Sequence, residues 1–270
     1  EILRCLVGSE MCIRDRHKTQ NIISIIGLAV GLLCFCVCIY CSRFVESTDH
    51  CFANHDRIAE LNLYDGKADR YFSGSPVPLA EDLRTWSLGE TEAISSVTYP
   101  RERPYYVELS PEKTLPYELE TIEIDTCYNK IFTPEMVAGH WKMASQSLNS
   151  VILSQSMAIK IFGNAESAIG KHMTLMRRLN TSPESTPKTG GIVYTIQAVM
   201  KDIPLNNSLD FMQNIDMLTV NDSEGLLQSP KRYNMTGANT YVLLSPQTTC
   251  TDLEKQFSKR DYTYTLYDEA

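Results

Sequence analysis

The chain has 270 residues and is acidic, with 33 Asp and Glu against 25 Lys and Arg and a formal net charge of −8. It has no stripe of Lys and Arg with interleaved aromatic residues, which excludes an extended nucleic-acid-binding surface. Hydrophobic residues make up 43% of the sequence, enough for one sizeable domain or two small ones with real cores.

The first sixteen residues do not look like native protein. The stretch from Cys5 to Arg16 (CLVGSEMCIRDR) resembles translated sequencing-adapter read-through and has no amphipathic pattern, and the chain begins with Glu1 instead of Met. We therefore interpret residues 1–16 as a non-native leader and exclude them from the fold prediction.

A membrane-spanning helix is the first element that the sequence predicts. Residues Ile22 to Cys41 (IISIIGLAVGLLCFCVCIYC) form an uncharged run of twenty residues. As a helix this run spans roughly 30 Å, the thickness of a bilayer's hydrocarbon core. It ends without the small-residue exit of a cleaved signal peptide. We predict one uncleaved span within residues 17–41, because no later stretch is long and apolar enough for a second.

The charges that flank this run predict its orientation. Before it stand Arg14, Arg16, His17 and Lys18, whereas after it Arg43 is offset by acidic residues. Basic flanks stay in the cytoplasm, so everything after the run is predicted to lie outside the cytoplasm. When the leader is excluded, only His17 and Lys18 support this orientation.

Two patterns inside the apolar run have alternative interpretations. Gly27 and Gly31 form a G-x-x-x-G spacing that lets a second helix approach closely in lipid, although glycine is also simply frequent in membrane helices. Cys34, Cys38 and Cys41 share one helix face. They form either a thiolate site or, as buried cysteines usually do, part of an apolar packing surface, and we favour packing.

A stalk and then a folded domain are predicted after the span. Residues 42–54 are polar with scattered apolar positions, and we expect them to continue the helix as a stalk. Loose alternation over Arg57–Tyr64 predicts a first strand. Ser75 and Pro76 are typical of a helix start, and the apolar spacing after them predicts a helix. Further strands are predicted over residues 91–109 and 118–125.

The second half alternates strands and helices. A strand over Val151–Ser154 leads into a helix over Gln155–Phe162 that stops at Gly163. The loop 177–191 is rich in Ser, Thr, Pro and Gly, and it joins two strand-like segments into a long hairpin. Antiparallel signals mixed with helices predict the α+β class. The hairpin strands are predicted over residues 171–176 and 192–200, and the last elements over 210–220, 239–244 and 252–259.

The domain organisation follows from this order of elements. The strand, helix and hairpin from Val151 to Met200 form a locally complete block, and the chain resumes strand character at Leu209 and Tyr241. We therefore predict that residues 127–204 are a strand-rich subdomain inserted into a mixed α/β unit formed by residues 55–126 and 205–270. If so, the strand over residues 57–64 pairs with a strand from after residue 205.

No catalytic or ligand-binding motif emerges. Gly163 and Gly170-Lys171 are spaced wrongly for a phosphate loop, and His172 replaces the Ser or Thr that holds Mg²⁺. Ser75 is not in a G-x-S-x-G nucleophile elbow. We therefore expect no enzymatic activity and assign no catalytic or cofactor-binding residue.

A metal site is considered and rejected next to the predicted span. His50, Cys51 and His55 cluster there, but only Cys51 and His55 face one way, which is too few ligands. Cys5 and Cys12 precede the span, and the cysteines after it are Cys51, Cys127 and Cys250, an odd number that permits at most one disulfide and requires none. Four N-x-S/T triplets are glycosylation acceptors only in a eukaryotic secretory protein, at Asn180, Asn206, Asn221 and Asn234.

Three separated segments resemble the MacB/FtsX-type family of ABC-transporter permeases. NIISIIGLAVGLL is similar to the family's N-terminal helix, and DHCFANHDRI follows it as the family's D-x-F-H-x-N-x-D-R-I-Y-R stretch does. Cys51 stands at the family's Phe position and Phe52 at its His position, while Ala59 and Glu60 replace the usual Tyr-Arg. The matching residues are Asp49, Asn54, Asp56, Arg57 and Ile58.

Two later segments extend the resemblance over nearly the whole chain. VILSQSMAIKIFGNAESAIGKHMTL is similar to the family's strand, helix and FG…IGK turn, and YTIQAVMKDIPLNNSLDF is similar to its V-x-x-V/A-x-K-D-x-P-x-x-S return. The matching residues are Ser154, Ala158, Phe162, Gly163, Ile169, Gly170 and Lys171 in the first of these, and Val199, Lys201, Asp202, Pro204 and Ser208 in the second.

The resemblance implies a role in coupling. Family members work with a cytoplasmic ABC ATPase, and their membrane helices transmit its motion to a periplasmic domain, so the chain is expected to be the N-terminal part of a bacterial inner-membrane permease. Partners implied are the ATPase, a second or paired permease copy, membrane lipid, and a periplasmic adaptor or envelope protein. Family members have four or more membrane helices, whereas one is predicted here.

Two other function classes remain open. The first is a bitopic, FtsX-like regulator whose external domain controls a cell-envelope enzyme. The second is a tethered hydrolase, which has little support because no triad or metal cluster is present.

Overall fold

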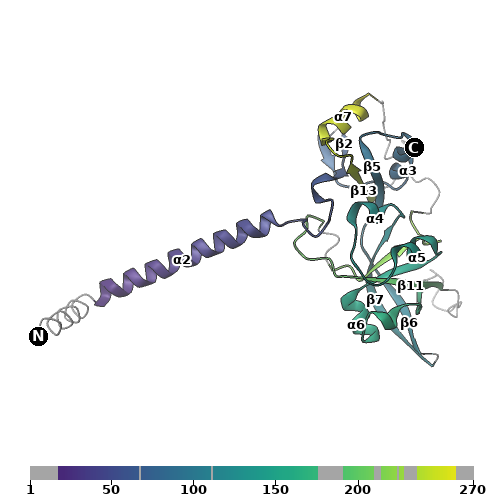
Figure 1. The fold of residues 1–270 in the computed structure, drawn as a ribbon, viewed down its shortest axis with the longest axis horizontal. Coiled ribbons are helices and arrows are strands. Elements are labelled where there is room, and N and C mark those ends of the chain that lie inside the picture. The colour runs from purple at the N-terminus through teal and green to yellow at the C-terminus, as the bar shows by residue number, and fades with distance from the viewer. Residues whose placement is uncertain are drawn as a thin grey trace, which may run out of the picture. The chain divides into compact units, whose positions relative to one another are not determined.

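The computed structural model describes residues 18–66, 68–110, 112–175, 191–209, 214–223, 225–227 and 236–259. The chain divides into two compact units, residues 1–48 and 49–270. In the first unit a single helix, α2, runs from Lys18 to Glu46 (Figure 1). Its most apolar 18-residue window has a mean hydropathy of 2.9, and none of that window is buried by protein. The helix is long and apolar enough to cross a membrane, as predicted.

The second unit is built on one 11-stranded sheet that branches. One part is a continuous series of pairings from β7 through β12, β9, β11 and β10 to β6, and β6 pairs in turn with β7. These pairings close a ring. The six ring strands are β6 (Arg101–Ser110), β7 (Lys113–Ile124), β9 (Ser150–Ser154), β10 (His172–Leu175), β11 (Ile192–Met200) and β12 (Met217–Val220).

The other part is a branch that leaves the ring at β7. There β5 pairs with β7 through Val97 and Ile124, and β13 then pairs with β5 along nearly its full length. A separate two-stranded hairpin, β2 with β3, lies outside this sheet. The remaining strands are β1 (Ile58–Leu61), β2 (Leu63–Asp65), β3 (Arg70–Phe72), β4 (Ser75–Pro76), β5 (Thr91–Thr98), β8 (Met136–Gly139) and β13 (Thr236–Leu244).

Short helices cover the sheet, and their caps explain where they begin and end. For α6 the Ser154 hydroxyl accepts the Met157 N–H at 3.4 Å, and Gly163 terminates the helix with a left-handed φ of 86°. At α7 a capping box joins Thr249 and Asp252. The helices are α3 (Leu79–Thr85), α4 (Tyr128–Phe132), α5 (Trp141–Gln146), α6 (Gln155–Phe162) and α7 (Cys250–Ser258), with single turns at His55–Arg57 and Glu166–Ala168.

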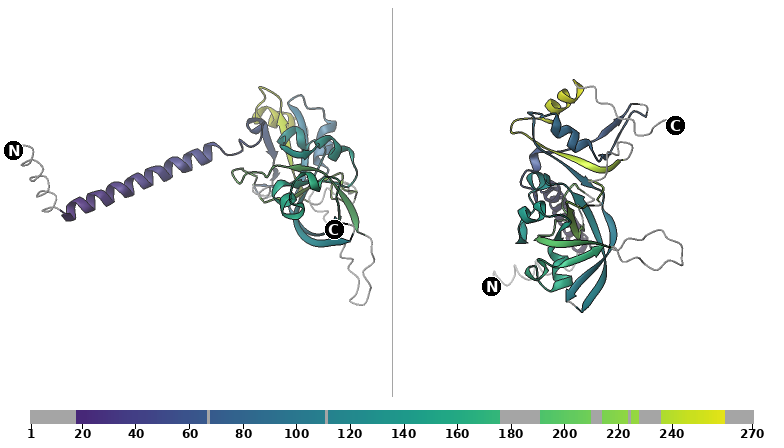
Figure 2. Two further views of the ribbon diagram at one scale, coloured as in Figure 1. Left: turned by 60° about the horizontal axis from the view of Figure 1, so that its bottom comes forward. Right: turned by 90° about the vertical axis from the view of Figure 1, so that its right-hand side faces the viewer.

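The apolar residues form three clusters that follow the strand alternation. Along β9, Val151 and Leu153 face a core that contains residues from all six ring strands and from α6, whereas Ile152 faces the opposite core. The opposite core lies between the ring, the branch, α4 and α5 (Figures 1 and 2). A third, smaller core joins α3 and α7 to β5 and β13. A sheet with apolar residues on both faces needs covering on both, which these helices supply.

Most predicted elements are confirmed, and the α+β class with them. The helix over Gln155–Phe162 and the strand before it are present, and the hairpin of β10 and β11 pairs antiparallel as expected. The predicted long-range pairing is also present, because Ile58 in β1 lies opposite Leu243 in β13. The insertion of residues 127–204 into a unit of residues 55–126 and 205–270 stays a prediction.

Two expectations were wrong in detail. The helix stops at Glu46, so residues 47–54 do not continue it as a helical stalk. Ser75 and Pro76 form the short strand β4, and α3 begins only at Leu79. The reason is burial: the Ser75 hydroxyl is inaccessible and hydrogen-bonds Thr240 at 2.7 Å, so it is not free to cap a helix. The loop 177–190 and the leader 1–16 lie outside the described residues.

One glycine tests the packing of β8 on the ring. Gly139 has a φ of 71°, and a Cβ there would lie 2.2 Å from the Gln197 carbonyl oxygen, at the point where β11 carries a bulge. We expect Gly139→Ala to lower the free energy of unfolding by about 3 kcal/mol or more, because strain and a backbone clash add. Urea unfolding followed by tryptophan fluorescence measures this.

Gly163→Ala is the matched control. Gly163 has a similar φ of 86° but nothing within 4 Å of an added Cβ. It should lose only about 1 kcal/mol. Equal losses in the two variants would show that φ alone matters and that β8 is not tightly packed.

Candidate functional site

The candidate site is the segment by which the chain enters the folded unit, residues 49–57, called the entry segment below. Its first residue is tied to a distant part of the chain. The Asp49 carboxylate accepts the Ser208 N–H at 2.7 Å, and the Asp49 N–H donates to the Asn206 carbonyl at 3.3 Å. Asp49 adopts a positive φ of 65°, which Asp tolerates better than most residues. The first and third resembling segments therefore meet at this point.

An aromatic side chain anchors the entry segment in the core. Phe52 is 5% exposed and packs edge-on against Phe132 at 5.3 Å, and Phe132 packs in the same way against Tyr241 at 5.2 Å. Cys51, at the family's Phe position, is exposed instead. The anchoring side chain is thus Phe52, which the sequence alone did not indicate.

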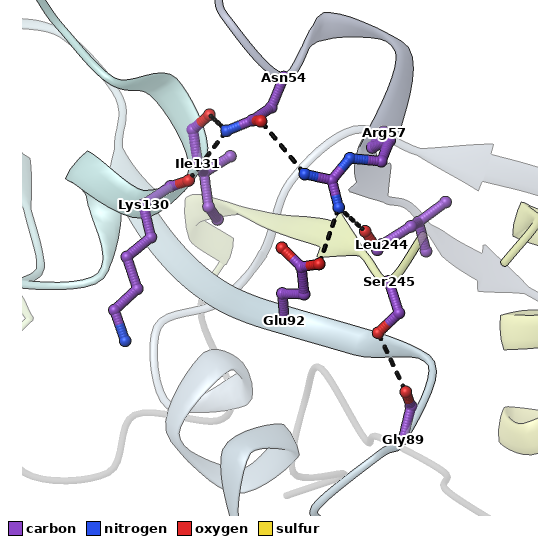
Figure 3. A network of polar contacts seen from close by, with 8 residues as sticks. All are labelled: Asn54, Arg57, Gly89, Glu92, Lys130, Ile131, Leu244 and Ser245. Carbon is purple, nitrogen blue, oxygen red and sulfur yellow. Dashed lines mark hydrogen bonds and ion pairs between the residues drawn. The ribbon is translucent and has the colours of Figure 1, made fainter. Parts of the chain in front are cut away.

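A polar network ties the end of the entry segment to three other elements (Figure 3). The Asn54 amide donates to the Lys130 and Ile131 carbonyls of α4, at 3.1 and 3.4 Å. Arg57 donates to the Asn54 side-chain oxygen at 3.2 Å and to the Leu244 carbonyl of β13 at 2.9 Å.

The same network reaches the start of β5. Arg57 pairs with Glu92 at 2.9 Å, and the Ser245 hydroxyl donates to the Gly89 carbonyl at 3.0 Å (Figure 3). Arginine suits this position because its planar fork offers several donors in fixed directions. Asn54 and Arg57, both singled out by the resemblance, are thus cross-links between elements.

The other resembling residues also have structural contacts. The Asp202 carboxylate accepts the Ser156 N–H at 3.0 Å in the first turn of α6, and the Lys201 ammonium pairs with Glu135 at 2.9 Å. Gly170 has a φ of 78° and donates its N–H to the Ile196 carbonyl at 2.8 Å. Gly170-Lys171 is therefore a turn against β11.

The rejected metal cluster is only partly assembled. The rings of His50 and His55 lie 4.4 Å apart, and His55 contacts the Phe52 carbonyl at 3.2 Å and the exposed Asp56 carboxylate at 3.2 Å. Within the described ranges, no group of three or more His, Cys, Asp and Glu side chains is arranged to hold a metal ion. Cys51, Cys127 and Cys250 are free thiols.

Further marked residues lie elsewhere. Cys34, Cys38 and Cys41 are on α2, and Gly27 and Gly31 on the same helix have nothing within 4 Å of an added Cβ. The Asn221 amide donates to the Ser145 carbonyl at 2.6 Å, which removes it as a free surface amide. Asn180 and Asn234 lie outside the described residues.

A buried carboxylate, which sequence reasoning missed, lies where β7 meets the segment after β12. Glu123 is 5% exposed, and its two oxygens accept the N–H groups of Leu226 at 2.6 Å and Leu227 at 2.8 Å. Gly225 makes this approach feasible, because a Cβ there would lie 2.0 Å from Glu123 Oε1. Burial raises the pKa of Glu123 to about 7, against the opposing effect of the two N–H donors.

Comparison with known proteins finds similar folds among solved structures but no similar sequence family. No protein-family model matches the chain, and no curated protein matches its sequence. Among solved structures, a domain assigned to a permease protein from Porphyromonas gingivalis is similar, with a TM-score of 0.57 at 22% identity over 78% of this chain and 87% of that chain. The periplasmic region of MacB from Actinobacillus actinomycetemcomitans has a TM-score of 0.50 at 13% identity, over 80% of this chain and 86% of that chain.

A third solved structure is more distant. The extracellular domain of the ABC-type transporter YknZ from Gram-positive bacteria has a TM-score of 0.41 at 14% identity, over 73% of this chain and 87% of that chain, too low to support an argument. The first two similarities establish the fold: an apolar helix precedes a mixed α/β domain like these periplasmic and permease domains.

Removing the aromatic anchor should destabilise the folded unit. We expect Phe52→Ala to lower the free energy of unfolding by about 3–5 kcal/mol, because a fully packed ring leaves a cavity. Urea denaturation of the chain in lipid nanodiscs measures the loss. The neighbouring exposed Cys51→Ala should change it by no more than about 0.5 kcal/mol. A larger effect at Cys51 than at Phe52 would show that Phe52 is not the anchoring side chain.

Glu123 should make stability fall as the pH rises. Its pKa is about 7 in the folded chain against an ordinary value of 4.5, so the folded state binds the proton more tightly. The contribution is complete below pH 4.5 and is lost towards pH 7, by about 3 kcal/mol at most. Glu123→Gln cannot titrate, so the stability difference between wild type and variant should decline over this range. A difference independent of pH would show that Glu123 stays ionised.

Proposed function

We propose that this chain is the N-terminal part of an ABC-transporter permease, with its domain outside the cytoplasm. The domain would couple ATP-driven motion to the export or extraction of a substrate. The observation that carries the proposal is the combination of fold and anchor. A domain similar to a permease domain and to the periplasmic region of MacB directly follows a helix able to span a membrane.

The contacts of the entry segment support a mechanical role. Only Ser47 and Thr48 separate the end of α2 from Asp49, which is hydrogen-bonded to the segment at residues 206–208. Phe52 and Arg57 then fasten the segment to α4 and β13. A displacement of the chain at Asp49 is therefore passed to the sheet, because a packed core transmits strain instead of absorbing it.

The partners follow from this role. We propose a cytoplasmic ABC ATPase, a second or paired permease copy, contact with membrane lipid, and a periplasmic adaptor or envelope protein. In this proposal the N-terminus lies in the cytoplasm of a bacterial cell, the domain lies in the periplasm, and the chain itself catalyses no reaction.

Co-purification tests the proposal. The full open reading frame that encodes this chain should be affinity-tagged and purified from its native membranes. We expect a P-loop ATPase to co-purify and the preparation to hydrolyse ATP with sensitivity to vanadate. The chain purified without that partner should not bind ATP, and Lys171→Ala should make no difference, since Gly170-Lys171 forms a turn against β11.

Three outcomes would contradict the proposal. ATP binding by the chain alone that Lys171→Ala abolishes would point to an enzyme. A cell-envelope hydrolase that co-purifies without any ATPase would favour the FtsX-like regulator. Failure of every ATPase to co-purify under conditions that retain other membrane partners would remove the transport role.

A further inference from the structure

No described residue covers one face of the ring, on the outer side of β6, β7, β10 and β11. Along β6 the residues alternate sharply: Tyr105 and Val107 are fully buried inside the ring, whereas Tyr106 is 38% exposed. The same alternation continues on β11, where Tyr194 is buried and Val193 is 51% exposed. The outward positions of β6, β7, β10 and β11 are called the outer hairpin face below. The exposed or partly exposed ones include Glu102, Pro104, Tyr106, Glu108, Thr114, Pro116, Glu118, Glu120, His172, Thr174, Val193 and Thr195.

An apolar row crosses this face in register. Pro116 on β7 lies opposite Tyr106 on β6, Tyr106 lies opposite Thr174 on β10, and Thr174 lies opposite Val193 on β11. Residues directly opposite in antiparallel strands point to the same side, with Cβ atoms about 5 Å apart. The row is therefore one continuous strip across four strands, with Pro104 beside it.

Glutamates surround the strip on β6 and β7. Glu102, Glu108 and Glu118 are exposed and Glu120 is partly exposed, and none of these four carboxylates forms an ion pair with a described residue. The outward positions of these two strands from 102 to 108 and from 114 to 120 carry no Lys or Arg. On β6 and β7 the strip is therefore bordered by negative charges alone.

The arrangement of these charges costs stability within the chain. Glu102 lies directly opposite Glu120 on the same face, and like charges in that position repel. The arrangement brings no compensating contact within the described chain. A cationic partner would remove the repulsion and gain attraction from both carboxylates at once.

The backbone limits how a partner can bind here. The edge of β7 before Thr121 is not covered by β12, whose pairing begins at Thr121, but Pro116 interrupts that edge. Proline has no N–H to offer, so an added strand would lack a ladder hydrogen bond there. The face is therefore suited to side-chain contacts across the strip and not to strand addition at its edge.

We propose that the outer hairpin face docks a Lys- and Arg-rich segment of a partner polypeptide. Long basic side chains fit this surface, because their aliphatic stems can lie along Tyr106 and the prolines while the charged ends reach the glutamates. Figure 2 shows β6 and β7 extending together to one end of the folded unit, where a partner can reach them. The inference does not depend on the proposed transport role, since only the chemistry of this face enters it.

The test uses the whole chain in phosphatidylcholine nanodiscs, so that the lipid carries no net charge. The probe is a fluorescein-labelled peptide of seven Lys-Thr repeats, with a Glu-Thr peptide as the charge-reversed control. We expect the basic peptide alone to bind at about 0.15 M salt. The triple variant Glu102→Gln, Glu118→Gln and Glu120→Gln should weaken binding about tenfold.

A matched variant separates this face from overall charge. Glu81, Glu166 and Glu254 are exposed on α3, on the turn after α6 and on α7, so replacing all three by Gln changes the net charge equally. This variant should bind the peptide as the wild type does. Equal loss in the two triple variants, or no loss in the first, would overturn the proposal, as would failure of the wild type to bind.

Two further measurements identify the occupant and detect misfolding. Glu102→Lys should raise the melting temperature by about 1–2 °C, because it faces Glu120 with opposite charge, and yet it should weaken peptide binding. A photo-crosslinking p-benzoylphenylalanine at Tyr106 should capture the peptide, whereas the same group at the exposed Tyr71 should not. Crosslinks from Tyr106 to lipid or to a second copy of the chain instead would overturn the proposed occupant.

Discussion

Strand β7 is the constraint on which the rest of the domain depends. It pairs with β6 along most of its length, with β12 at Thr121–Ile124, and with β5 at its last residue. It is therefore both a member of the ring and the origin of the branch. Its side chains point alternately to two cores: Leu119 lies in the core inside the ring, and Ile122 lies in the core outside it. A residue inserted into β7 would exchange these two faces, because the side-chain period of a strand is two.

The parts that could be predicted from the sequence are those with strong local signals. The helix over Gln155–Phe162 has a capping Ser154 and a terminating Gly163. The apolar run of α2 has the length of a membrane-spanning helix. A pairing of the first strand with a strand after residue 205 was also predictable, since the block from Val151 to Met200 was locally complete, but the choice of β13 and the antiparallel direction come from the structure.

Other features depend on contacts that no local pattern records. The ring also requires β6 to pair with β10, which is distant in sequence, and nothing in either sequence segment indicates this pairing. Ser75 looks like a helix cap, but burial against Thr240 decides its conformation. Glu123 looks like any acidic residue of an alternating strand, and only the fold places two backbone N–H groups on it. The anchoring role of Phe52 likewise depends on where Phe132 of α4 and Tyr241 of β13 lie.

The hydrogen bond between Asp49 and Ser208 also limits the order in which native contacts can form during synthesis. The two residues are 159 positions apart, and among the described strands β1 pairs with β13, the last of them in sequence. During synthesis the segment that follows α2 is made before the strand with which β1 pairs, because β13 lies near the other end of the described chain. Strand β1 therefore stays unpaired until β13 has been made, although Phe52 and Asn54 can meet α4 earlier. The start of the domain is therefore the first part to be made, whereas β1 is among the last strands to acquire its native pairing, so a nascent domain keeps an open sheet edge until synthesis has passed β13.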